Sequence, residues 1–429
     1  MSARFDVVVV GAGPGGIAAA TLAAEAGRRV CLVDDNAAPG GQLWRGFRAE
    51  TAANSLHGAG FLHWTSRLSI TNCEVCSGWQ VVSLPAVGQL RIERDGEGRD
   101  LGFDQLIVAT GARERFLPFP GWTLPGVTGS GGMQALLKAG LDARGKRVVV
   151  AGSGPLLLAV AAELAHAGAR VLGIHEQASL TRLAGFGLTL AVSPGKLVEG
   201  ARYRLQTLRA PYRTGTWVVR AEGRERVERV TLTDGRKQWT TDCDWLACGF
   251  HLTPNLELPR LLGCRVVDGY VAVDALRQSS APGVFCIGEL TGIGGLDKAL
   301  LEGQIAGLAA AGRAAQAQTL AGRLPRFLRF AERLDRAFAL RPELRALAEP
   351  RTLVCRCEDV AYSAVKDCAS RREAKLHTRC GMGACQGRVC GAATEFLFGW
   401  ENTGARPPIF PTQVSALAAA AGAPESHKP

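Results

Sequence analysis

FDVVVVGAGPGGIAAATLAAEAGRRVCLVDD, residues 5–35, carries the clearest signal of the fold in this sequence. It reads as an apolar strand, a Gly-rich turn, a helix with small residues facing a sheet, and a second strand that ends in an acid. Gly11 permits the tight turn, Gly13 lets the backbone approach a pyrophosphate, and Gly16 lets helix and strand pack closely. Because the helix N-terminus offers free N–H groups to phosphate, the stretch predicts a dinucleotide-binding βαβ unit.

The acidic end of the second strand agrees with this prediction. Asp34 follows Gly16 by eighteen residues, at a distance where a carboxylate accepts hydrogen bonds from an adenosine ribose. The residues that we expect to bind the dinucleotide here are Gly11, Gly13, Pro14, Gly15, Gly16, Asp34 and Asp35.

Composition limits the class of protein. Of 429 residues, 47% are hydrophobic and 21% charged, as in globular proteins with large cores. The net charge of +11 comes from scattered arginines, so nucleic acid is not an expected partner. We expect no secretory signal, no transmembrane segment and a cytoplasmic location. The 13 cysteines are then reduced, and clustered ones indicate a metal or redox site.

Three later segments resemble the two-dinucleotide-domain flavoproteins, the superfamily of the pyridine-nucleotide disulfide reductases. FDQLIVATGA (103–112) resembles the strand between the two domains, GVFCIGELTGIGG (283–295) the segment at the flavin's ribityl chain, and PGGQL (39–43) a flavin-contacting turn. The resemblance implies FAD as the first ligand. The residues that it adds are Gly41, Gln42, Ala109, Thr110, Gly111, Gly288 and Glu289, and we also expect Val81 in the FAD-binding set.

A second βαβ unit follows, KRVVVAGSGPLLLAVAAELAHAGARVLGIHEQ (146–177). Its turn repeats the first two glycines, but Leu157 stands at the third Gly position. His175 rather than an acid aligns with Asp34, and Glu176 comes one place later. The resemblance implies NAD(P)H here, while the departures leave ATP, NAD without hydride exchange, or a structural domain open. The expected nucleotide-binding residues are Gly152, Gly154 and Glu176.

Disulfide reductases carry a redox cysteine pair beside the flavin, and neither family position offers one here. GGQLWRGFR (40–48) has no cysteine. Cys73 and Cys76 have CxxC spacing, and Cys243 and Cys248 flank another short segment, but both pairs read as strand residues of the core. We therefore expect electrons to leave the flavin by another route.

Four cysteines near the C-terminus form two pairs. Cys355 and Cys357 make a CxC pair, and Cys385 and Cys390 make a CxxxxC pair in HTRCGMGACQGRVCG (377–391). Four paired thiolates suit [2Fe–2S] or Zn²⁺, and the glycines let backbone N–H groups reach the sulfurs of a negatively charged cluster. Because CxC is cramped for a zinc knuckle, [2Fe–2S] is favoured, with zinc and unligated thiols as alternatives.

Residues 352–391 are similar to the bacterioferritin-associated-ferredoxin type of [2Fe–2S] module. The whole chain, through LPFPGWTLPGV, CRCEDV, TRCGMGACQGRVC and RPPIFP, resembles the α (A) subunits of heteromeric amine and opine dehydrogenases. That family includes hydrogen cyanide synthase, opine oxidases, and D-hydroxyproline and dye-linked L-proline dehydrogenases. The resemblance implies Cys355, Cys357, Cys385 and Cys390 as cluster ligands and leaves Cys380 out.

The resemblance also implies a division of labour. A β subunit of the D-amino-acid-oxidase fold oxidises the amine, and this chain relays electrons through interfacial FMN, the cluster and FAD to an acceptor such as a quinone. A small γ ferredoxin-like subunit is a further candidate partner. We assign this chain no catalytic acid or base. Arg356, Arg379 and Arg388 either hold the FMN phosphate or are ordinary surface and ion-pair residues.

Two other functions stay open. A stand-alone NAD(P)H-dependent flavin/iron–sulfur reductase needs a working second nucleotide site, and the missing third Gly counts against it. A non-catalytic assembly protein would hold flavin and cluster as structural elements.

These placements predict an α/β fold with two Rossmann-like domains of the disulfide-reductase type and a small α-helical ferredoxin-like module. We expect an FAD domain (1–118 and 255–315), a second nucleotide domain (119–254), a helical linker (316–350), the [2Fe–2S] module (351–400), and a docking segment with a frayed tail (401–429). The basic amphipathic helix at 323–340 either straps the module to the FAD domain or lies on the inner face of the cell membrane.

Overall fold

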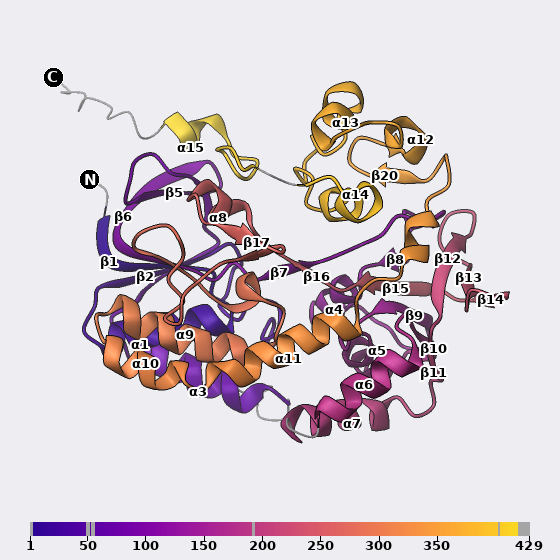
Figure 1. Ribbon diagram of the computed structural model, residues 1–429, viewed down its shortest axis with the longest axis horizontal. Helices are drawn as coiled ribbons and strands as arrows, with labels where there is room; N and C mark the ends of the chain where they lie inside the picture. Colours follow the sequence, from indigo (N-terminus) through magenta and orange to yellow (C-terminus); the bar gives the residue numbers. More distant parts are fainter. Residues whose placement is uncertain (1–2, 49–51, 53–55, 191–193, 402–403, 419–429) are drawn as a thin grey trace. The chain divides into compact units, whose positions relative to one another are not determined.

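The computed structural model describes residues 3–48, 52, 56–190, 194–401 and 404–418 (Figure 1). The chain forms two compact units. Unit 1 comprises residues 1–112, 254–332 and 404–429, and unit 2 comprises 113–253 and 333–403. Each unit contains a largely parallel sheet built on one of the two βαβ stretches. The finer division into five parts remains a prediction.

The sheet of unit 1 is built around the quoted stretch. β1 (Ala3–Val10), α1 (Pro14–Glu25) and β2 (Val30–Asp34) form the expected βαβ unit, with β1 and β2 paired in parallel. The strand order is β3-β2-β1-β6-β5-β4, with β19 beside β6. Its other strands are β3 (Glu74–Ser77), β4 (Gln80–Ser83), β5 (Gln89–Arg94), β6 (Glu97–Val108) and β19 (Val284–Cys286). The segments that resemble FAD-binding motifs therefore follow the carboxyl ends of the neighbouring strands β1, β6 and β19.

Glycines bring two helices of unit 1 close together. In Figure 1, α1 and α9 (Leu296–Ala310) lie side by side. A Cβ added to Gly303 would lie 2.2 Å from the carbonyl oxygen of Gly15, and one added to Gly307 would lie 2.4 Å from that of Ala19. No larger residue fits at these two positions. Other helices of the unit include α3 (Gly58–Ser69), α8 (Glu257–Leu261) and α10 (Ala314–Ala321).

Unit 2 repeats the arrangement on a smaller sheet. β9 (Arg147–Ser153), α5 (Leu156–His166) and β10 (Arg170–Glu176) form its βαβ unit. The strand order in the sheet is β11-β10-β9-β15-β8. Its other three strands are β8 (Val127–Thr128), β11 (Tyr212–Thr214) and β15 (Trp245–Phe250). An antiparallel sheet of β12 (Trp217–Glu222), β13 (Arg229–Thr233) and β14 (Gln238–Asp242) belongs to the same unit, as do α4 (Ser130–Lys138), α6 (Leu180–Leu190) and α7 (Pro194–Gln206).

The C-terminal cysteines lie in a small module of unit 2. It consists of β20 (Leu353–Cys355), β21 (Val360–Ala361), α12 (Tyr362–Val365), α13 (Arg371–Thr378) and α14 (Cys390–Phe398). The indole N–H of Trp122 donates to the carbonyl of Leu353 at 2.6 Å, and Val389 and Phe396 pack against the core that contains Trp122. The module is therefore joined to the second sheet domain by side-chain packing.

The chain then returns to unit 1. The N–H of Ile409 donates to the carbonyl of Val82, and Arg91 donates to that of Leu417 in the short helix α15 (Val414–Ala418). The expected docking segment thus packs on its own chain, while the expected frayed tail lies outside the described residues. The basic pattern at 323–340 forms α11 (Leu324–Ala337). Within the described part of the chain, no helix is long and apolar enough to cross a membrane.

Candidate functional site

The Gly-rich turn after β1 has room for a phosphate. Gly11 has a φ of +105°, and a Cβ on Gly16 would lie 1.8 Å from the Gly11 carbonyl oxygen. A Cβ on Gly13 would meet no atom within 4 Å. Gly13 is the N-cap of α1, no side chain caps this helix, and Pro14 occupies its first turn. The open space at an uncapped helix N-terminus fits the pyrophosphate of a dinucleotide.

Asp34 points toward this turn. Its buried carboxylate accepts hydrogen bonds from the backbone N–H of Ala12 and, at 2.8 Å, from both the backbone and the side chain of Asn36. Asp35 is exposed at the next position. Asp34 is therefore held at the place where an adenosine ribose is expected, and Asn36, which the sequence analysis did not single out, orients it.

The PGGQ turn lies against the Gly-rich turn. The N–H of Gly40 donates to the carbonyl of Ala12 at 2.7 Å, and a Cβ on Gly41 would lie 2.9 Å from the Cα of Gly13. Gln42 is exposed beside it. Val81, by contrast, is buried on β4 with its side chain in the core, so only its backbone could face a ligand.

The Ala-Thr-Gly segment also reaches the first turn. A Cβ on Gly11 would lie 2.3 Å from the carbonyl oxygen of Ala109. Asn255 holds the next two residues, because its side-chain amide donates to the Thr110 carbonyl at 2.7 Å and its backbone N–H donates to the Gly111 carbonyl at 3.0 Å. Asn255 is a second residue that the sequence analysis missed.

A buried ion network supports the turn at Gly288. Lys298 and Glu302 are fully buried on α9, and their charged groups lie 3.0 Å apart. Glu302 accepts the N–H of Gly288 at 2.7 Å, and Lys298 donates to the Gly288 carbonyl at 2.7 Å. Arg277 completes the network with a 3.1 Å bond to Glu302. The signal available in the sequence was an i, i+4 Lys–Glu pair on a helix of otherwise small and apolar residues.

Glu289 closes the following loop. Its carboxylate accepts the N–H groups of Gly294 and Gly295 at 3.1 and 3.0 Å. Burial raises the pKa of Glu289 above its usual range. Glu289 therefore fixes the two residues that come directly before α9.

In unit 2, the acid that aligns with Asp34 is Glu176. The strands pair Val171 with Val148 and then Gly173 with Val149, which leaves Leu172 as a bulge. The extra residue brings Glu176, and not His175, opposite Gly152. The prediction that His175 aligns with Asp34 is therefore wrong. It assumed a regular strand, whereas the bulge at Leu172 shifts the following residues by one position.

Glu176 is held in the same way as Asp34. Its carboxylate accepts the N–H of Gly154 and that of Ala178, both at 2.8 Å, and it is fully buried. Burial raises the pKa of Glu176 to about 7. Leu157 packs into the core at the third Gly position. The second turn thus keeps the acid and two glycines, and a buried leucine replaces the third glycine.

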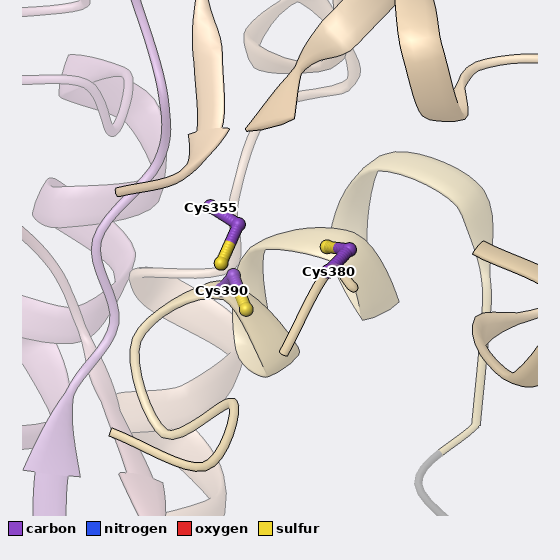
Figure 2. A group of neighbouring side chains, drawn as sticks. All are labelled: Cys355, Cys380 and Cys390. Atoms are coloured by element: carbon purple, nitrogen blue, oxygen red, sulfur yellow. The ribbon is translucent and has the colours of Figure 1, made fainter. Parts of the chain in front are cut away.

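Sulfur atoms from distant segments converge in the C-terminal module. Figure 2 shows Cys355 on β20, Cys390 at the start of α14, and Cys380 close to both; the three Sγ atoms lie within 4.8 Å of one another. Cys357 and Cys385 share a hydrogen bond with each other. The structure therefore brings Cys355 and Cys390 together with Cys380, which reaches them without any rearrangement of the loop, and pairs Cys357 with Cys385. Among the described residues, no group of three metal donors contains Cys357 or Cys385, so the four-ligand set remains a prediction.

The backbone around these sulfurs suits thiolates. The N–H of Gly381 donates to the Sγ of Cys355 at 3.5 Å. Burial opposes ionisation of Cys385, but the N–H of Val389 and the thiol of Cys357 lower its pKa overall. A donor set of paired thiols with N–H groups directed at sulfur fits an iron–sulfur cluster.

Arg371, at the first turn of α13, faces the same loop. Its guanidinium occupies the space next to Gly387 and Gly391, where an added Cβ would lie 2.4 and 3.3 Å from its Nη2. Its Nη1 is buried and has no hydrogen-bond partner among the described residues. A cation with an unused donor beside the cysteine loop is consistent with a negatively charged group bound there. Arg356, Arg379 and Arg388 were predicted from the sequence as candidates for an anionic group, whereas Arg371 was not.

Comparison with known proteins agrees with this geometry. The family described as pyridine nucleotide-disulphide oxidoreductase matches residues 5–318. The chain belongs to this family. Its helical cysteine module lies beyond the matched residues.

Two relatives of this oxidoreductase extend over nearly the whole chain. The opine oxidase A chain of Rhizobium meliloti is 33% identical and covers 96% of this chain and 98% of its own length. Hydrogen cyanide synthase subunit HcnB of Pseudomonas protegens is 32% identical over 90% of each chain. These relatives confirm the resemblance to the subunits of opine and cyanide-forming dehydrogenases.

Solved structures confirm the fold. L-proline dehydrogenase from P. horikoshii has a TM-score of 0.69 and 21% identity, covering 97% of this oxidoreductase and 80% of that chain. Thioredoxin reductase of T. acidophilum has a TM-score of 0.55 and 20% identity, covering 73% of this chain and 99% of that chain. The chain is a member of a flavin-dependent oxidoreductase family, which implies binding of FAD or NAD(P).

Proposed function

We propose that this chain is the electron-transfer subunit of a heteromeric flavin-dependent dehydrogenase for an amine, opine or D-hydroxyproline-type substrate. The observation that supports the proposal is that one small module contains Cys355 beside Cys390 and Cys357 beside Cys385, in a chain without a redox cysteine pair at either family position. Its full-length relatives are named as subunits of opine oxidase and hydrogen cyanide synthase.

The residues divide into two cofactor sites. The Gly-rich turn receives the FAD pyrophosphate, Asp34 the adenosine ribose, and the loop from Gly288 to Gly295 the ribityl chain and ring. Cys355, Cys357, Cys385 and Cys390 hold a [2Fe–2S] cluster. FAD exchanges two electrons and can release them singly, whereas the cluster carries one. This chain orients the two cofactors and sets their electrostatic environment, and its partner supplies the amine-binding pocket.

The expected partner is a β subunit of the D-amino-acid-oxidase fold, with FMN at the interface and a quinone as acceptor. A further candidate partner is a small γ ferredoxin-like subunit. Arg356 and Arg379 are exposed near the cysteines and remain candidates for the FMN phosphate, although Arg379 already pairs with Glu358 at 2.7 Å. We place the complex in the cytoplasm, with peripheral contact at the inner membrane face.

The test isolates the complex from its native host through a tag on this chain. Partners are identified by mass spectrometry, and dye reduction is measured with proline, D-hydroxyproline, glycine and opines. The chain alone should contain FAD, iron and sulfide, give a rhombic paramagnetic signal after dithionite, and leave amines unchanged. The complex should reduce the dye. Cys385→Ser should abolish this activity, whereas Cys243→Ser, a buried core position, should retain it.

Two results would contradict the proposal. Amine oxidation by the isolated chain would place the substrate pocket here. Zinc in place of iron and sulfide would remove the electron-transfer centre.

A second function is favoured by one observation, the register of Glu176 opposite Gly152. In this register Glu176 occupies the position of the ribose-binding acid in a dinucleotide site. A stand-alone NAD(P)H-dependent flavin/iron–sulfur reductase requires such a site. Rapid mixing with NADH distinguishes the two. Fast bleaching of the flavin supports the reductase, whereas tight binding of NAD or ATP without bleaching supports the electron-transfer role.

A further inference from the structure

Unit 1 contains a second group of sulfur ligands that the proposed electron path does not use. Cys31 on β2 and Glu74 and Cys76 on β3 place two Sγ atoms and a carboxylate oxygen within 4.8 Å of one another. The two Sγ atoms are 3.7 Å apart, and a Glu74 oxygen lies 3.6 Å from the Sγ of Cys76. We propose that these three side chains bind a thiophilic divalent cation, Zn²⁺.

The strand register creates this arrangement. β2 and β3 pair in parallel, with Cys31 opposite Glu74 and Val33 opposite Cys76. Glu74 and Cys76 are two residues apart on one strand, so their side chains lie on the same face of the sheet. Cys31 contacts Cys76 on that face. The donors are therefore fixed by backbone pairing and do not depend on a loop.

The sulfur separation fits a shared metal ion. Zinc binds thiolate at about 2.3 Å, so two thiolates at neighbouring corners of a tetrahedron are about 3.8 Å apart. The observed 3.7 Å between Cys31 and Cys76 agrees with that spacing.

Burial and charge also suit a cation. Cys31 is fully buried and Cys76 is 5% exposed, while Glu74 is exposed and provides the route from solvent. Two buried thiolates are unfavourable without a counter-ion, and a dication with two thiolates and a carboxylate leaves a net charge of only −1. Arg99 lies 3.7 Å from Glu74, with 40% and 44% of the two side chains exposed. Because this exposed ion pair is long and weak, Glu74 can bind a metal ion in place of Arg99. Water would be the fourth ligand of the zinc.

Unit 1 supplies a matched control. Cys264 and Cys286 are a second pair of buried thiols in mutual contact. Among the described residues, no acid joins them in a group of three metal donors. This pair therefore has the sulfurs and the burial of the proposed site but not its carboxylate.

The experiment titrates the reduced, full-length holoprotein with zinc, removes unbound ion by gel filtration, and measures zinc and iron by mass spectrometry. We expect one retained zinc per chain, with two sulfur neighbours at about 2.3 Å in its X-ray absorption spectrum. Cys31→Ala/Cys76→Ala should lose this zinc, and Cys264→Ala/Cys286→Ala should keep it. Equal zinc in the wild type and in Cys31→Ala/Cys76→Ala would overturn the proposal.

Glu74→Gln keeps the test decisive if loss of a buried thiol prevents folding. Glu74 is exposed, so this variant should fold normally and keep its FAD and iron. Its zinc affinity should fall at least tenfold. An unchanged affinity would show that the three-donor site does not exist.

Discussion

Glu176 stands opposite Gly152 in the β9–β10 ladder, and its carboxylate accepts the N–H of Gly154. In unit 1, Asp34 accepts the N–H of Ala12, one residue earlier in the corresponding turn. An acid in this position accepts hydrogen bonds from a ribose 2′-hydroxyl and repels a 2′-phosphate.

The second site should therefore prefer NAD or ATP to NADP. At pH 8, above the pKa of about 7 that burial gives Glu176, Glu176→Ala should weaken binding of the preferred nucleotide by about tenfold, since a hydrogen bond to a charged group contributes about 1.5 kcal/mol or more. Calorimetric titration of the FAD-loaded chain measures this. Equal affinity for NAD and NADP in the wild type would contradict the assignment.

Gly13 and Gly16 should respond differently to alanine. A Cβ on Gly13 meets no atom within 4 Å, and the residue has a φ of −71°, so Gly13→Ala should fold normally. The added methyl group enters the space assigned to the pyrophosphate, so FAD content should fall severalfold. Gly16→Ala places its Cβ 1.8 Å from the Gly11 carbonyl oxygen and should damage the fold as well. Thermal unfolding of the apoproteins and the ratio of flavin to protein separate the two effects.

Removal of Lys298 should destabilise unit 1. Lys298→Met leaves Glu302 buried with Arg277 as its remaining cationic partner, and breaking a buried ion pair costs about 3 kcal/mol. FAD should be lost with it, because Lys298 and Glu302 both bind the backbone of Gly288. Urea unfolding gives the free energy. Lys298→Met/Glu302→Gln should recover part of the lost free energy of unfolding. Arg323→Met, at an exposed position, should change neither the free energy of unfolding nor the FAD content.

Local patterns allowed much of the site to be predicted from the sequence. The turns at Gly11 and Gly152 and the two C-terminal cysteine pairs each lie within a short stretch, where spacing alone indicates the chemistry. The bulge at Leu172 gives no such signal, because one extra residue in a strand is visible only once its partner strand is known. Position counting therefore placed His175 where Glu176 stands.

Long-range contacts explain the other omissions. Asn255 meets Thr110 across 145 positions of sequence, and Arg371 reaches Gly387 only after α13 packs on the cysteine loop. Neither residue stands in a motif. Cys380 was set aside because spacing suggested that the loop would need rearrangement, whereas the folded loop already holds it near Cys355 and Cys390.

Arg371 should raise the reduction potential of a cluster bound by this loop. A nearby positive charge stabilises the added electron, so Arg371→Gln should lower the potential by an amount on the order of tens of millivolts. Titration monitored by the paramagnetic signal measures this shift. Arg372→Gln, at the exposed neighbouring position, is the control, and equal shifts in both variants would argue against a specific role for Arg371.

Cys380→Ser should separate a ligand from a bystander. If the two thiol pairs hold the cluster, the variant should keep full iron and sulfide, whereas Cys385→Ser should lose most of both. Iron and acid-labile sulfide assays of the purified variants decide this. Loss of the cluster in Cys380→Ser would move Cys380 into the ligand set.

His175 should make unit 2 sensitive to acid. Burial, with a smaller contribution from the charge of Arg213, lowers the pKa of His175 from 6.5 to about 4. Between pH 6.5 and pH 4 the unfolded chain binds this proton and the folded chain does not, so its contribution to stability is constant above pH 6.5 and falls as the pH decreases. The loss reaches about 3 kcal/mol near pH 4.

The measurement is urea unfolding of the wild type and of His175→Asn at a series of pH values. The variant has its own constant offset from the lost contact with Thr216. Beyond that offset, the two curves should be parallel above pH 6.5 and should converge or cross as the pH falls toward 4, because only the wild type is destabilised by protonation. Replacement of the exposed His63 should leave the shape of the wild-type curve unchanged. Parallel curves for the wild type and His175→Asn down to pH 4 would show that His175 is not the residue that senses acid.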